Sequence, residues 1–90
     1  MAETFLEILI KPGIPPVIRH AIEGALEELE FEVAGGGSYV DGSASDIALY
    51  VDDVEETIPS IIAILQQLRV PRATVILQTE PQEKTYAVYG

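Results

Sequence analysis

The sequence predicts an α+β fold, a two-layer sandwich in which an antiparallel sheet carries two helices on one face. Two segments, 16–29 and 54–68, place apolar residues at helical spacings of three and four. The segments around them are short and apolar or alternating, as strands are. With 90 residues, 48% of them hydrophobic, the chain is long enough for one core, and we expect a single domain over residues 1–90.

The first predicted strand covers residues 4–10 and has apolar residues on both faces, which is typical of a central strand. One face carries Leu6, Ile8 and Ile10, and the other carries Phe5, Glu7 and Leu9. A helix follows and begins at Pro15-Pro16, because the first helical residues need no N–H partner. Its expected apolar stripe is Ile18, Ala21, Ile22, Ala25 and Leu29.

A hairpin is predicted next, with Phe31 and Val33 facing the core and Asp41-Gly42 at its turn. A plain two-residue loop there would turn Phe31 and Val33 away from the core side of the return strand, which holds Ile47, Leu49 and Val51. We therefore expect either a three-residue loop or one extra residue bulging within 35–37. The three glycines favour the bulge, because a left-handed bulge residue is usually glycine.

The second helix has two possible starts. Asp53 and Glu56 resemble a capping box, which places the start at Asp53. Pro59 then lies inside the helix, so the helix either bends near Glu55 or begins only at Thr57.

Two strands complete the chain. Residues 73–78 are expected to turn Val75 and Leu77 toward the core and Thr74 and Ile76 away from it. Residues 85–89 form a short last strand, which either joins an edge of the same sheet or reaches another subunit.

This order of elements resembles the ferredoxin-like superfold, the split βαβ arrangement, with one strand added. The resemblance implies that strands one and three lie side by side in the centre, that strands two and four form the edges, and that both helices cover one face. The superfold hosts regulatory ligand-binding domains, metal carriers, RNA binders and enzymes, so the resemblance implies no single function.

Composition excludes several classes of function. Fifteen acids against five bases give a net charge of −10, which disfavours nucleic acid and anionic membrane surfaces as partners. No apolar run is long enough to span a membrane. The chain has no cysteine, and Glu3 and Glu7 interrupt what a secretion signal would need, so we expect a cytoplasmic protein.

No catalytic constellation is recognisable. The single histidine, His20, is expected on the flank of a helix, and no serine has a nucleophile signature, so we expect no enzyme. The aspartates are explained by turns and a helix start, and they lack the spacing of a calcium loop, so no metal and no cofactor is expected.

The candidate site is the sheet face that the helices leave open. On it we expect Phe5, Leu9, Tyr50 and Ile76 to form an apolar patch that binds a protein partner, most simply a second copy in a homodimer. Gly36, Ser38 and Asp46 are a weaker candidate for a ligand site beside Tyr50, because glycine lets a ligand approach a strand closely.

The sequence therefore predicts a non-enzymatic acidic interaction domain. One alternative is a small-molecule-binding regulatory domain with its site near the Gly-rich hairpin. Another is an acidic inhibitor or immunity-type protein that covers a basic surface with helix acids, which are Glu23, Glu27, Glu28, Glu55 and Glu56.

Overall fold

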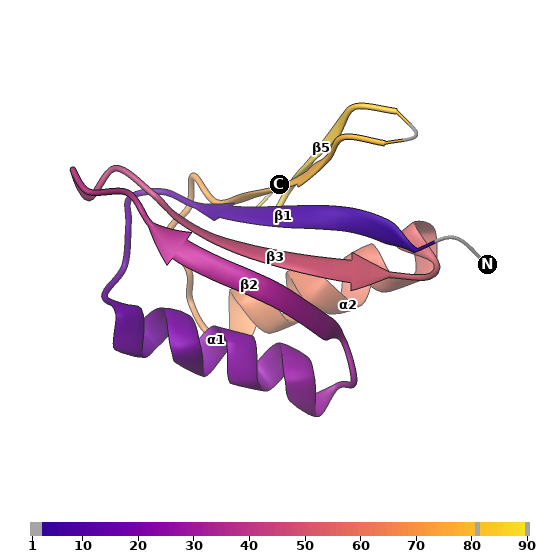
Figure 1. Ribbon diagram of the computed structural model, residues 1–90, viewed down its shortest axis with the longest axis horizontal. Coiled ribbons are helices and arrows are strands. Elements are labelled where there is room, and N and C mark those ends of the chain that lie inside the picture. The colour runs from indigo at the N-terminus through magenta and orange to yellow at the C-terminus, as the bar shows by residue number, and fades with distance from the viewer. Residues whose placement is uncertain (1–2, 81, 90) are drawn as a thin grey trace.

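The computed structural model describes residues 3–80 and 82–89, which form an α+β arrangement of five strands and two helices (Figure 1). The elements are β1 (Thr4–Ile10), α1 (Pro16–Glu28), β2 (Glu32–Ser38), β3 (Ser45–Val51), α2 (Val54–Gln67), β4 (Val75–Gln78) and β5 (Lys84–Ala87). The element order expected from the sequence is confirmed, including the start of α1 at Pro16 after Pro15.

The strands form one open antiparallel sheet in the order β2-β3-β1-β4-β5. β1 lies in the middle, between β3 and β4, as its apolar residues on both faces indicate. The expectation that β4 forms an edge is wrong. β5 pairs along β4 from Lys84 to Ala87 and satisfies backbone groups that an edge strand would leave open. The last strand therefore joins its own sheet.

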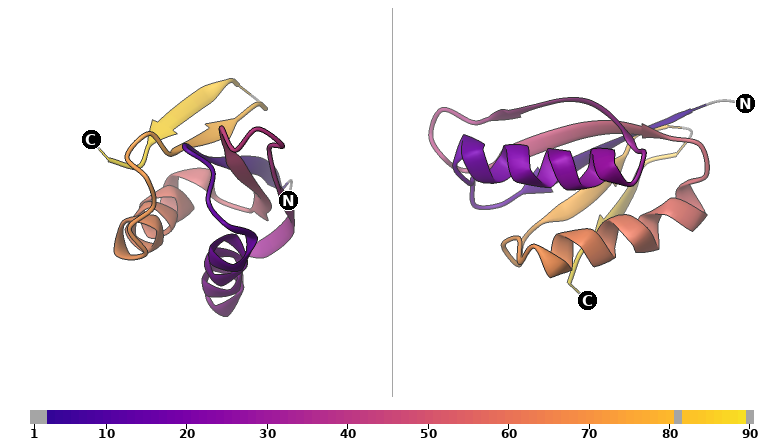
Figure 2. Two further views of the ribbon diagram at one scale, coloured as in Figure 1. Left: turned by 90° about the vertical axis from the view of Figure 1, so that its left-hand side faces the viewer. Right: turned by 90° about the horizontal axis from the view of Figure 1, so that it is seen from below.

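A single apolar cluster joins the two helices to one side of the sheet. Alternate residues of β1, which are Leu6, Ile8 and Ile10, are fully buried. They share the cluster with Ile22 and Leu26 of α1 and with Ile58, Ile61 and Leu65 of α2. Figure 2 draws α1 and α2 below the sheet in its left-hand view, with a gap between their axes.

The buried stripe of α1 differs from the expected one. Ile22 and Leu26 are buried, whereas Ile18 is 47% and Leu29 54% exposed. The buried stripe of α1 is therefore centred on the i, i+4 pair Ile22 and Leu26, and Leu26 is not part of the expected stripe. The same helix also contacts β2, where Arg19 Nη1 donates a hydrogen bond of 2.9 Å to Ser38 Oγ.

The hairpin contains the expected bulge, one residue earlier than predicted. Pairing with β3 shifts register between Val33 and Gly35, so Ala34 is the extra residue. The glycines of residues 35–37 are not in the left-handed region, and only Gly42 has a positive φ among the described glycines, at 76°. The bulge is thus not a left-handed glycine bulge, but it still restores parity, because Val33 lies opposite Leu49 and packs on the core.

The faces of β4 are reversed relative to the prediction. Ile76 is 0% exposed and lies opposite Ile8, so it belongs to the core and not to the open face. Thr74 is likewise buried, at 1% exposure. Gln78 shares this face because its amide has partners: Nε2 donates to Glu80 O at 3.0 Å, and Oε1 accepts from the Tyr86 hydroxyl at 3.3 Å.

The second helix begins at Val54, so the later start at Thr57 is wrong. The Asp53 side chain caps the helix by accepting the Glu56 N–H at 3.1 Å. Pro59 lies within the helix. Near its other end, α2 contacts the segment that follows β5, since Gln66 Nε2 donates a hydrogen bond of 2.7 Å to Val88 O.

Candidate functional site

The side of the sheet opposite to the core cluster is the candidate site, and we call it the open face. Strand register defines its members, because residues directly opposite each other in paired strands point to the same side. Three rows cross the sheet: Glu32, Tyr50 and Phe5; then Gly35, Ala48, Glu7, Leu77 and Thr85; then Gly37, Asp46, Leu9, Val75 and Ala87. Most of its large apolar side chains are half-buried or exposed.

An exposed aromatic pair marks one end of the open face. Phe5 and Tyr50 lie opposite each other in β1 and β3. Their ring centroids are 5.4 Å apart with an interplanar angle of 64°, which is an edge-to-face contact. Each side chain is 37% exposed. The structure thus brings together two of the four residues expected to form the patch.

The rest of the predicted patch is partly replaced. Leu9 lies on the open face and is half-buried, as expected. Ile76 does not, and its place is taken by Val75, opposite Leu9, and Leu77, opposite Glu7. Sequence reasoning missed both because β4 has apolar residues at consecutive positions, so its pattern does not say which parity faces the core.

Two carboxyl groups lie within this apolar surface. Glu7 is opposite Ala48, and Asp46 is opposite Leu9, so the two acids are diagonal neighbours on the same face. Partial burial first, and the Asp46 carboxylate second, raise the pKa of Glu7 above its ordinary value of 4.5. In the sequence, Glu7 is the one charged residue within the otherwise largely apolar segment 4–10, and this indicates a carboxylate within the apolar surface.

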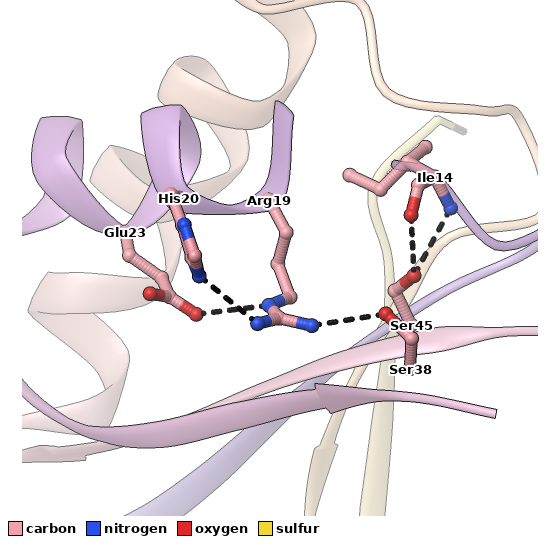
Figure 3. A network of polar contacts seen from close by, with 6 residues as sticks. All are labelled: Ile14, Arg19, His20, Glu23, Ser38 and Ser45. Carbon is pink, nitrogen blue, oxygen red and sulfur yellow. Dashed lines mark hydrogen bonds and ion pairs between the residues drawn. The ribbon is translucent and has the colours of Figure 1, made fainter. Parts of the chain in front are cut away.

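The polar ligand edge expected from Gly36, Ser38 and Asp46 is not assembled. Gly36 lies opposite Ile47, and with Ser38 it faces α1, whereas Asp46 faces the open side. Figure 3 shows Arg19 reaching from α1 to Ser38, with its Nε 3.3 Å from Glu23 Oε2. Gly36 makes room for this ion pair, because a Cβ at this position would meet the Glu23 carboxylate and lie 2.8 Å from Asp46 O.

The groups considered for catalysis have structural partners. His20 is exposed, and its Nε2 lies 3.1 Å from Arg19 Nη2 (Figure 3). Ser45 is buried; its Oγ accepts the Ile14 N–H at 3.0 Å and donates to Ile14 O at 3.3 Å. These contacts position the turn into α1. Within residues 3–80 and 82–89, no group of acids and histidines has the geometry to hold a metal ion.

An acidic hollow of about 440 Å³ adjoins the open face at Tyr50. Six of its lining residues are acids, which are Glu3, Glu30, Glu32, Asp52, Asp53 and Glu56; the others are Leu29, Phe31, Tyr50, Val51 and Thr57. A hydrogen bond shared with Glu32, and the charge of Glu32, raise the pKa of Glu3. The hollow thus extends the negative potential of the open face around the end of the sheet.

Apolar side chains are also exposed outside the open face. On the helices and their C-caps these are Val17 at 73%, Ile18, Leu29 and Leu68. Val17 lies at the start of α1 and Leu29 just after its end, about 18 Å away, so the two do not belong to one compact patch. At the hairpin tip, Tyr39 is 53% exposed and Val40 is fully exposed. The open face is the surface on which strand register makes apolar residues direct neighbours.

Replacing Glu7 by glutamine is expected to stabilise the protein by about 0.5 kcal/mol near neutral pH, because it removes a partly buried charge and the repulsion of that charge from Asp46. Since folding raises the pKa of Glu7, protonation favours the folded state. Protonation of Glu7 stabilises the folded state fully below the ordinary pKa of 4.5, and this stabilisation is lost as the pH rises through the pKa that Glu7 has in the folded protein. The gain should therefore disappear at about pH 4, which urea unfolding at the two pH values measures.

The matched control is Glu27→Gln on the exposed side of α1, which removes the same formal charge. An equal gain from both variants would mean that general charge repulsion, and not the Glu7–Asp46 neighbourhood, explains the effect.

Neither a protein-family model, nor a curated protein, nor a solved structure matches this chain. None of the helices in the described parts of the chain is both long enough and apolar enough to cross a membrane.

Proposed function

We propose that this chain is a non-enzymatic interaction domain that binds a protein partner through the open face. The observation that supports this most strongly is the Phe5–Tyr50 pair, two large aromatic rings in contact and each 37% exposed. Aromatic residues are enriched where proteins bind each other, and clustered exposed apolar groups mark such surfaces. Leu9, Val75 and Leu77 extend the patch across the central strands.

We also infer that the two layers belong to the ferredoxin-like superfold, with β5 added beside β4. The adjacent, antiparallel β1 and β3 and the repeated strand–helix–strand order support this assignment. In that arrangement both helices cover one face, which leaves the other face free for a partner.

A heterologous partner is favoured over a second copy. Face-to-face self-association would place the open-face acids of both copies, Glu7, Glu32 and Asp46, in one interface that has no base among the described residues of that face. Like charges that lie close together at an interface cost on the order of several kcal/mol of binding free energy, which disfavours such a complex. The net charge of −10 adds a long-range repulsion between copies.

An acidic inhibitor that covers a basic surface is the second candidate. The observation that favours it is the acidic hollow beside Tyr50. Of the helix acids expected to cover a basic surface, only Glu56 lines this hollow. Glu23 is instead paired with Arg19. A small-molecule site at Gly36 and Ser38 has less support, because Arg19 already binds there.

Selection from a displayed library of random peptides tests the proposed function. Peptides that bind the folded chain should lose about tenfold or more in affinity on Tyr50→Asp, because a charge replaces an aromatic anchor. They should keep their affinity on Val17→Asp, which introduces the same charge on α1 at a side chain that is 73% exposed. Loss on Val17→Asp with none on Tyr50→Asp would move the binding surface to the helices and contradict the proposal.

A further inference from the structure

The two carboxyl groups of the open face lie inside its apolar rows and not at their rim. Glu7 occupies the central strand, with Ala48 on one side and Leu77 on the other. Asp46 lies diagonally from Glu7 and opposite Leu9. Any partner that covers the apolar side chains therefore also removes these carboxylates from water.

None of the described residues on the open face is basic. The five bases of the chain lie elsewhere: Lys11 beyond the end of β1, Arg19 on α1, Arg69 and Arg72 after α2, and Lys84 opposite Gln78 on the core side of β5. Arg19 is already paired with Glu23. Among the described residues, no base forms an ion pair with Glu7 or Asp46. A partner that buries these carboxylates therefore stabilises the complex if it supplies the counter-charge.

We infer that the partner of the open face is a protein segment that places a lysine or arginine, flanked by apolar side chains, over Glu7 and Asp46. This inference rests on the proposed function. Burying an unpaired carboxylate is strongly unfavourable, and a cation in contact offsets that cost. An arginine suits the site because its planar group both pairs with carboxylates and stacks on aromatic rings such as those of Phe5 and Tyr50.

The neighbouring repulsion gives the cation an additional role. Partial burial first, and the Asp46 carboxylate second, raise the pKa of Glu7, and the Asp46 contribution is a repulsion between the two carboxylates. A cation between them relieves that repulsion. A neutral or acidic segment of the same shape would bury the two carboxylates without relieving their repulsion. The open face therefore selects against such partners.

Three small probes of one shape and different charge test this inference: benzamidine, a planar aromatic cation, with neutral benzamide and anionic benzoate. Each is titrated into the full chain while NMR signals of Leu9, Leu77 and Tyr50 are followed. Benzamidine should bind at these residues about threefold more tightly than benzamide, as expected for a partly exposed ion pair, and benzoate more weakly still. The double variant Glu7→Gln/Asp46→Asn should remove the preference for benzamidine.

The control is Glu27→Gln/Glu28→Gln on α1, which changes the net charge equally and should keep the preference. The amide spectrum of each variant confirms that it is folded. Equal binding of benzamidine and benzamide at the open face would overturn the inference and leave the docking face in place. Shifts centred on Leu29, Phe31 and Val51 would assign the cation to the acidic hollow and overturn the inference as well. If none of the three probes shifts the open-face signals, the inference is also wrong, and the peptide selection decides the proposed function separately.

Discussion

Replacing Ile76 by alanine is expected to lower the free energy of unfolding by about 3 kcal/mol, whereas Leu77→Ala should lower it by about 1 kcal/mol. Ile76 is 0% exposed and packs opposite Ile8 in the core, so truncation leaves a cavity that its neighbours fill only in part. Leu77 is half-buried on the open face, where water replaces the lost methyl groups. Urea unfolding of the two variants measures the difference.

The two residues are neighbours in one short strand, so the comparison holds strand position and local backbone constant. It separates the two possible parities of β4. A larger loss for Leu77→Ala than for Ile76→Ala would mean that β4 turns its other face to the core, with Ile76 on the open face. The patch around Phe5 and Tyr50 would then have a different composition.

Gly36→Ala is expected to cost about 2 kcal/mol, and Gly35→Ala to change stability by less than about 0.5 kcal/mol. A Cβ at Gly36 would lie 2.8 Å from the backbone oxygen of Asp46 and would also meet the Glu23 carboxylate. A Cβ at Gly35 would have no neighbour within 4 Å. The adjacent glycine is thus a matched control, and thermal or urea unfolding provides the measurement.

The double variant Glu23→Ala/Gly36→Ala separates the two contacts. Removing the Glu23 side chain should recover part of the loss, because only the contact with the β3 backbone remains. Equal stability of Gly35→Ala and Gly36→Ala would contradict the close packing of α1 on β2. Full recovery in the double variant would show that the β3 backbone adapts freely.

Several parts of the fold could be predicted because the arrangement of their apolar residues has one clear interpretation. β1 is central because both of its faces are apolar, and Ile47, Leu49 and Val51 of β3 are buried as their alternation indicates. The parity conflict between β2 and β3 correctly required an extra residue. Its position at Ala34 depends on how β2 lies against β3, which local pattern does not contain.

The orientation of β4 could not be predicted, for a physical reason. Val75, Ile76 and Leu77 are consecutive and similarly apolar, so only their polar neighbours suggest a face. Those neighbours mislead, because Gln78 is buried with partners from Glu80 and Tyr86 that lie later in the chain. The alternation of polar and apolar residues does not show that a polar side chain will find such partners and be buried.

The sequence predicted several residues of the candidate site, but not how these residues are arranged. Alternation placed Phe5, Leu9 and Tyr50 on the open face, but only the register between β1 and β3 brings the two aromatic rings into contact. Gly36 and Ser38 were assigned to the wrong face, because the bulge at Ala34 reverses their parity and Arg19 then binds Ser38. A bulge cannot be positioned from composition alone.

Intermolecular NOEs between a selected peptide and the full chain measure directly which surface binds. The open face predicts contacts from the peptide to the rings of Phe5 and Tyr50 and to the methyl groups of Leu9. Contacts confined to Val17, Ile18 and Leu68 on the helices would instead show that the partner binds the other layer, and the open face would lose its proposed role.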